Sequence, residues 1–200
     1  MSTAQVAHDR LPRMRVLADV LPRTQARDAA LVAGGAMLTA LAAQIAVEVP
    51  PSPVPVTGQT LAVGLVGATL GAKRGALSLA LYAVLGLMLP VYADGESGWD
   101  VVWGASGGYI VGFVAAAAAI GWLAEHGGDR RVLSTFAAFV VGQAIVFAFG
   151  LGGLKIAVGE SWGWTIHNGL GIFIVGGLIK AAIGAAVLPS AWRLVRGAER

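Results

Sequence analysis

The segment from Val54 to Gly86 reads VPVTGQTLAVGLVGATLGAKRGALSLALYAVLG. Nearly every residue in it is apolar or small, but the polar Gln59 lies near its start and the basic pair Lys73-Arg74 divides it in two. Two apolar runs on either side of a basic pair predict two short membrane helices joined by a turn. Gly71 and Gly75 flank the pair and are expected to form that turn.

The composition points to a chain that is surrounded by lipid. Of the 200 residues 56% are hydrophobic and only 12% are charged, and the mean hydropathy is +0.74. A soluble domain usually carries about 25% charged residues. The 29 glycines would allow close helix packing in a membrane. There is no cysteine, which excludes disulfides, zinc–thiolate sites and cysteine nucleophiles.

We therefore expect an all-α integral membrane protein built as a bundle of six transmembrane helices. A span needs about 20 predominantly apolar residues. The predicted spans are residues 29–47, 57–70, 76–89, 107–124, 133–154 and 170–188. The second and third are short, so a helical hairpin that enters the membrane and returns is an alternative for that pair. Residues 1–28 are expected to form a basic cytoplasmic tail, 29–195 the membrane domain and 196–200 a second cytoplasmic tail.

The distribution of charge predicts the orientation. If the N-terminus is cytoplasmic, every Lys and Arg except Lys155 and Lys180 falls on the inner side. The charged residues of the outer loops are then all acidic, namely Glu48, Asp94, Glu96, Asp100 and Glu160. Both termini should therefore be cytoplasmic, in the inner (plasma) membrane. Lys73-Arg74 would be a topological anchor, or else a contact with a partner subunit. Because the basic residues follow the membrane topology, no nucleic-acid partner is expected.

The predicted outer loops contain the proline-rich EVPPSPVP (48–55), YADGESGWDVVWGASGGY (92–109) and GESWGWTIHNG (159–169). The tryptophans in them form an interfacial belt or a lid over a ligand cavity that opens to the outside, and both readings stay open. These residues are Trp99, Trp103, Trp162 and Trp164.

Two polar residues within apolar spans are the strongest candidates for a site. Lys180 lies about ten residues from either end of its span, where an ionisable group is costly and suggests function rather than snorkelling. It would receive an anionic or carbonyl oxygen of a ligand, and Gly176 and Gly177 would leave room beside the backbone. Gln59 would meet an amide or urea group, or would form an interhelical hydrogen bond. Gln44 and Gln143 are expected to form interhelical bonds.

The fourth span begins with Gly107, Gly108 and Tyr109, and the tyrosine could stack on a flat apolar ring and offer its hydroxyl to a ligand. The glycine pair is not a phosphate loop, and no Walker A motif occurs, so the chain should not hydrolyse ATP itself. Asn168 is a further ligand-binding candidate, and His167 beside it lacks metal-ligand spacing to another histidine. Enzymatic function is therefore disfavoured, and no metal or cofactor is expected.

The first span carries small residues at helical spacing, which either pack within the bundle or dock a separate membrane subunit. These residues are Ala30, Gly34, Ala36 and Ala40.

Three segments together resemble one known family. They are PVPVTGQTLAVGLVGATLGAKRGALSLALYAVLGLMLPVYA, GGYIVGFVAAAAAIGWL and LIKAAIGAAVLPSAW. The chain resembles the BioY family, the biotin-binding S components of energy-coupling factor (ECF) transporters, from about residue 29 to residue 195. The resemblance implies six membrane helices, a pocket toward the outside, capture of biotin, and transport alongside a transmembrane coupling protein and two ATPases.

The resemblance also carries site residues over to this chain. Gln59, the motif Gly107–Tyr109 and Lys180 match positions near the family's pocket. Two positions depart from the family's pattern, because Ile172 stands where proline is expected and Gly177 where an acid is expected. A different vitamin, a self-sufficient channel or facilitator, and a membrane enzyme therefore remain alternatives, and a homo-oligomer is left open.

Overall fold

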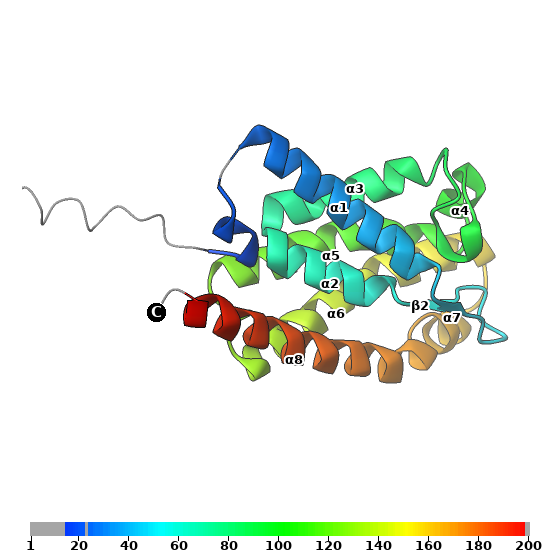
Figure 1. Cartoon of the computed structure of the whole chain (residues 1–200). Coiled ribbons are helices and arrows are strands. Elements are labelled where there is room, and N and C mark those ends of the chain that lie inside the picture. Colours follow the sequence, from blue (N-terminus) through cyan, green and yellow to red (C-terminus); the bar gives the residue numbers. More distant parts are fainter. Residues whose placement is uncertain (1–14, 23, 199–200) are drawn as a thin grey trace, which may run out of the picture.

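The computed structural model describes residues 15–22 and 24–198. Long helices lie roughly along one axis and form a bundle (Figure 1). They are α1 (Gln25–Ala43), α2 (Gln59–Leu70), α3 (Ala72–Leu85), α5 (Gly107–Glu125), α6 (Val132–Val158) and α8 (Ile174–Ala198). The arginines at positions 10, 13, 23 and 200, which are predicted to lie in the cytoplasmic tails, are outside the described residues.

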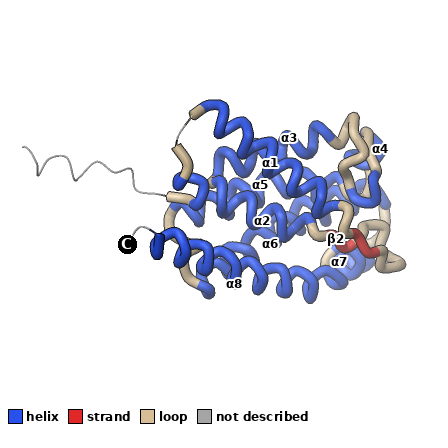
Figure 2. The backbone as a smooth tube through the Cα atoms, in the orientation of Figure 1, coloured by secondary structure: helices blue, strands red, loops and turns tan. Residues whose placement is uncertain are grey.

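Shorter elements gather at one end of the bundle (Figure 2). They are β1 (Ala46–Val47), β2 (Val56–Thr57), η3 (Ala93–Gly95), α4 (Trp99–Trp103), α7 (Trp162–Gly169) and η4 (Gly171–Phe173). The strands pair in antiparallel register and close the base of the proline-rich loop. Another short helix, η2 (Leu17–Val20), lies at the opposite end. The sequence did not predict α4, α7 or the strand pair, because these segments are too short to show a hydrophobic period.

The helical, membrane-type character predicted from composition is confirmed. Four helical segments of the described chain are long and apolar enough to cross a membrane, namely Gln25–Ala43, Gly107–Glu125, Val132–Val158 and Trp162–Val195. The helix α2 is apolar but shorter. The first span begins with α1 at Gln25, where the Thr24 side chain accepts a hydrogen bond from the Arg27 amide, and so starts earlier than expected.

Small residues let α2, α3 and α5 approach closely at the centre of the bundle. A Cβ on Gly67 would lie 2.6 Å from the carbonyl oxygen of Ala117, and one on Gly75 would lie 3.0 Å from the Cα of Gly67. The first contact is too close for a side chain and the second is tighter than usual, so glycine allows the close approach at these crossings. The glycine-rich composition therefore has the packing role predicted for it.

The chain turns between α2 and α3 at Gly71, while Lys73, Arg74 and Gly75 already belong to α3. Gly71 has φ +86° and ψ 174°, a conformation that essentially only glycine adopts. Beside it, the Ala72 amide donates to Oε1 of Glu125 at 2.8 Å, which fastens the turn to the end of α5. The predicted turn therefore exists but is tighter than expected.

Candidate ligand-binding site

A cavity of about 400 Å³ lies at the end of the bundle that carries the short elements. Its walls come from the proline-rich loop 48–55, the first turns of α2 and α5, the middle of α6, and η4 with the start of α8. Pockets for small molecules typically have volumes of about 300–1,000 Å³ and apolar walls with a few polar groups. The cavity therefore has the size and composition of a small-molecule site.

Three aromatic rings form one side of this cavity. Tyr109 and Phe147 are 6.5 Å apart between ring centroids at 88°, and Phe173 is 6.3 Å from Tyr109 and 6.1 Å from Phe147. The Tyr109 hydroxyl donates to the carbonyl oxygen of Gly169 at 2.7 Å, which ties α5 to α7. The ring lines the cavity, and its stacking on a ligand stays a prediction. The hydroxyl, which the sequence offered to a ligand, instead donates its proton within the protein.

Gln59 lines the cavity and is held by two side chains. Its Nε2 donates to the Tyr82 hydroxyl at 2.6 Å, and its Oε1 accepts from the Thr57 hydroxyl at 2.7 Å. Because Tyr82 belongs to α3, the interhelical role that the sequence offered for Gln59 is present. The contact with a ligand remains a prediction, supported by the position of Gln59 in the wall of the cavity.

Lys180 also lines the cavity, on α8 opposite the start of α2. Its Nζ donates to the Thr57 carbonyl oxygen at 2.5 Å and to the Thr60 hydroxyl at 3.1 Å. Both acceptors are neutral, and no carboxylate of the described residues pairs with the positive charge. Since a charge away from water is stabilised by a counter-ion, an anionic ligand oxygen would be favoured here.

Gln143 on α6 and Gly177 on α8 both line the cavity and contact each other. The Gln143 Nε2 donates to the carbonyl oxygen of Gly177 at 2.6 Å, which confirms the interhelical bond expected for this glutamine. The sequence did not predict that Gln143 also lines the cavity. A single polar residue on an apolar helix gives no signal that distinguishes a helix contact from a wall of a pocket.

Other cavity residues were missed for a different reason. Tyr82 and Tyr92 line the cavity and pack edge to face, with ring centroids 5.7 Å apart. The Tyr92 hydroxyl donates to the Ala83 carbonyl oxygen at 2.6 Å, and burial raises the pKa of this phenol, so it stays a donor. In the sequence both tyrosines look like ordinary core or interface residues.

Some predicted site residues lie outside the cavity wall. Gly107 abuts Val102, and Gly108 is a close crossing point with α6, where a Cβ would lie 2.5 Å from the Phe149 carbonyl oxygen. Asn168 is buried in α7 and donates to the Trp164 carbonyl oxygen at 3.0 Å. These three residues position α5 and α7 next to the site.

The tryptophans of the outer loops are not part of the cavity wall as described. Trp99, Trp103 and Trp162 are exposed, while Trp164 is partly buried. The exposed rings fit an interfacial belt better than a lid. Within the described residues no group of three or more His, Cys, Asp or Glu could hold a metal ion.

The small residues of α1 divide between two faces. Ala36 is buried against the bundle and Ala40 is half-buried, so they pack within the protein rather than offering a docking surface. Ala30 and Gly34 are exposed, and a Cβ on Gly34 would meet nothing within 4 Å.

An apolar helical bundle that holds a partly aromatic cavity with one lysine defines an integral membrane ligand-binding protein. The BioY family matches residues 14–197, and the chain belongs to this family.

Similar proteins include three named biotin transporters. The chain is 32% identical to biotin transporter BioY2 of Lactococcus lactis subsp. cremoris over 154 residues, covering 76% of this chain and 83% of that protein. It is 34% identical to biotin transporter BioY of Rhizobium etli over 165 residues (74% and 88%). It is 36% identical to biotin transporter BioY of Thermotoga maritima over 142 residues (70% and 82%).

A solved structure has the same fold. The crystal structure of the S-component for biotin from an ECF-type ABC transporter superposes with a TM-score of 0.74 at 22% identity, covering 86% of this chain and 95% of that one.

Proposed function

We propose that the chain is the membrane-embedded biotin-binding subunit of a vitamin uptake transporter. The observation that carries the proposal is the cavity of about 400 Å³ in a BioY-family chain, with an aromatic wall and with Lys180 as its basic residue. The role is binding and transport rather than catalysis.

Biotin matches the chemistry of this cavity. Its fused rings are apolar on their faces and would pack on Tyr109, Phe147 and Phe173. Its ureido group carries two N–H donors and a carbonyl acceptor, and its side chain ends in a carboxylate. Lys180 would donate a hydrogen bond to one of these oxygens. Gln59 also lines the cavity and would contact the ligand there.

The proposal includes an orientation. Six helices would cross the membrane, with both termini cytoplasmic and the cavity open to the outside. The acidic loops at the cavity end and the basic residues at the other end support this orientation. Since the sequence has no nucleotide-binding loop, concentrative uptake would need an ECF transmembrane coupling protein and ATPase subunits.

Isothermal titration of the purified full-length protein in detergent with biotin tests the binding. We expect tight binding by the parent protein. The variant Lys180→Met should bind roughly 10- to 100-fold more weakly, because a hydrogen bond to a charged group is lost. Lys155→Met is the matched control, because Lys155 is partly exposed at the end of α6 and its bonds within the described residues go to the carbonyl oxygens of residues 159 and 160.

Two outcomes would contradict the proposal. Absence of binding by the parent protein at micromolar biotin would point to a different vitamin. Biotin uptake into liposomes by the chain alone, without ATPases, would identify a facilitator instead of a transporter subunit.

A further inference from the structure

The side-chain amide of Gln143 lies over Gly177, on the side of α8 where a side chain at position 177 would stand. A Cβ on Gly177 would overlap Oε1 of Gln143 and would lie 3.0 Å from the amide carbon and 3.2 Å from Nε2. Glycine at position 177 is therefore what allows the amide from α6 to reach the backbone of α8.

The hydrogen bond between the two residues decides which way the amide faces. The carbonyl oxygen of Gly177 can only accept, so the NH₂ group of Gln143 must point toward it. The amide oxygen Oε1 is then left as an acceptor, and it receives no hydrogen bond from any residue that the structure describes. Gln143, Gly177 and Lys180 all line the cavity.

Three other polar side chains of the wall, at and before the start of α2, are engaged within the protein. Both polar atoms of the Gln59 amide are bonded, and the Thr57 hydroxyl donates to one of them. The Thr60 hydroxyl accepts from Lys180. The carboxylates that line the cavity lie outside the long helices, Glu48 and Glu96 in loops and Asp94 in the short η3. Oε1 of Gln143 is thus a neutral acceptor in the helical part of the wall that is available to a ligand.

We propose that Gln143 is a specificity-determining residue whose Oε1 accepts a ureido N–H of the ligand, and that Gly177 holds it in position. This inference rests on the proposed biotin function. A neutral acceptor in this place has a physical advantage, because a carboxylate next to Lys180 would pair with the lysine and compete with an oxygen of the ligand. The amide leaves the charge of Lys180 available to the ligand.

The test measures discrimination between ligands by titrating purified full-length protein with biotin and with two biotins methylated on one or the other ureido nitrogen. In the parent protein one of the two methylations should weaken binding roughly tenfold or more, because Oε1 loses its donor. In Gln143→Met, biotin should bind roughly tenfold more weakly and the penalty for that methylation should shrink several-fold. Gln25→Met, at the exposed start of α1, is the matched control.

A second variant tests the same contact without removing Gln143. Gly177→Ala should push the amide away from α8 and reproduce both changes, while Gly152→Ala, where a Cβ meets nothing within 4 Å, should behave like the parent. If Gln143→Met does not fold, Gly177→Ala carries the test alone.

The outcomes separate this inference from the proposed function. Tight biotin binding with unchanged methyl discrimination in the variants would overturn the role of Gln143 and leave the biotin function intact. Weaker binding with unchanged discrimination would indicate a merely structural role, and would overturn it as well. No binding of biotin by the parent protein would overturn the proposed function, and the inference with it.

Discussion

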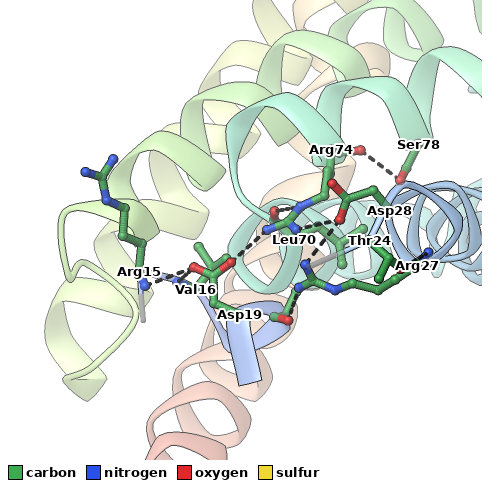
Figure 3. A network of polar contacts seen from close by, with 10 residues as sticks. Arg15, Val16, Asp19, Thr24, Arg27, Asp28, Leu70, Arg74 and Ser78 are labelled. Atoms are coloured by element: carbon green, nitrogen blue, oxygen red, sulfur yellow. Dashed lines mark hydrogen bonds and ion pairs between the residues drawn. The ribbon is translucent and has the colours of Figure 1, made fainter. Parts of the chain in front are cut away.

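Lys73 and Arg74 are neighbours in the sequence, but the fold gives them different surroundings. Lys73 is exposed on the first turn of α3. Arg74 is largely buried, and its guanidinium bonds Asp28 at 3.0 Å, Asp19 at 3.3 Å and the Leu70 carbonyl oxygen at 2.8 Å (Figure 3). The sequence suggested a topological anchor for both residues. Arg74 in addition joins η2, α1 and the end of α2.

We expect Arg74→Met to lower the free energy of unfolding by about 1–3 kcal/mol, because the buried Asp19 would lose its ion pair with Arg74. Lys73→Met is the matched control and should change stability by less than about 0.5 kcal/mol. Thermal unfolding of the two variants in the same detergent compares them. Equal melting temperatures would mean that the pair acts through charge alone.

Individual residues of the cavity wall could be predicted where a polar or ionisable side chain stands in an otherwise apolar helix. Lys180 stood out as an ionisable group in an apolar helix, and Gln59 as an amide at the start of one, and both line the cavity. Gln143 was recognised only as a helix contact, because its neighbour across the bundle, Gly177, is 34 positions away in the chain. Such a pairing depends on how α6 and α8 are packed, which no local pattern reveals.

At the scale of elements, α2 explains how a short helix can belong to a membrane bundle. Its 12 residues extend about 18 Å, well below the roughly 30 Å of a hydrocarbon core. Most of its residues are buried and its first turn meets the cavity. Beyond its last turn, Gly71 lies close to the buried Val16, just before η2. Because protein surrounds both ends, the helix need not match the bilayer thickness.

The exposed face of α1 offers a separate test of partner docking. Gly34→Leu should leave the fold and biotin binding unchanged, because a Cβ there would meet no atom of the described residues within 4 Å. The added bulk should keep a partner helix from approaching closely, so biotin uptake by cells that supply the ECF coupling proteins should fall roughly tenfold. Gly34→Ala, which keeps a small residue, is the control. Uptake by Gly34→Leu at the parental rate would remove α1 from the docking surface.

At the scale of the whole molecule, charge separates along the axis of the bundle. The cavity end carries Glu48, Asp94 and Glu96. At the other end lie Lys73 and Arg74, in the first turn of α3, and Arg130, in the turn after α5. This asymmetry could be predicted because basic residues recur after every second apolar run. The folds of the loops between those runs could not be predicted. The tryptophans in α4 and α7 fitted a belt and a lid equally well until their exposure was known.

The absence of native cysteine makes the proposed orientation directly measurable. Glu160→Cys, in the exposed loop after α6, and Lys73→Cys, at the exposed start of α3, place one thiol at each end of the bundle. In right-side-out vesicles a membrane-impermeant maleimide should label Glu160→Cys and should leave Lys73→Cys unlabelled until detergent is added.

Inside-out vesicles should give the reverse pattern for the same two variants. Labelling of Lys73→Cys alone in right-side-out vesicles would turn the cavity toward the cytoplasm, which is incompatible with capture of a vitamin from outside. Labelling of both variants in right-side-out vesicles would contradict the proposal that α2 and α3 each cross the membrane. A short helix pair that enters and returns on one side, which the sequence left open for residues 57–89, would produce that result. It would expose Lys73 on the same side as the loop between β1 and β2, so Lys73→Cys and Ser52→Cys would then label together.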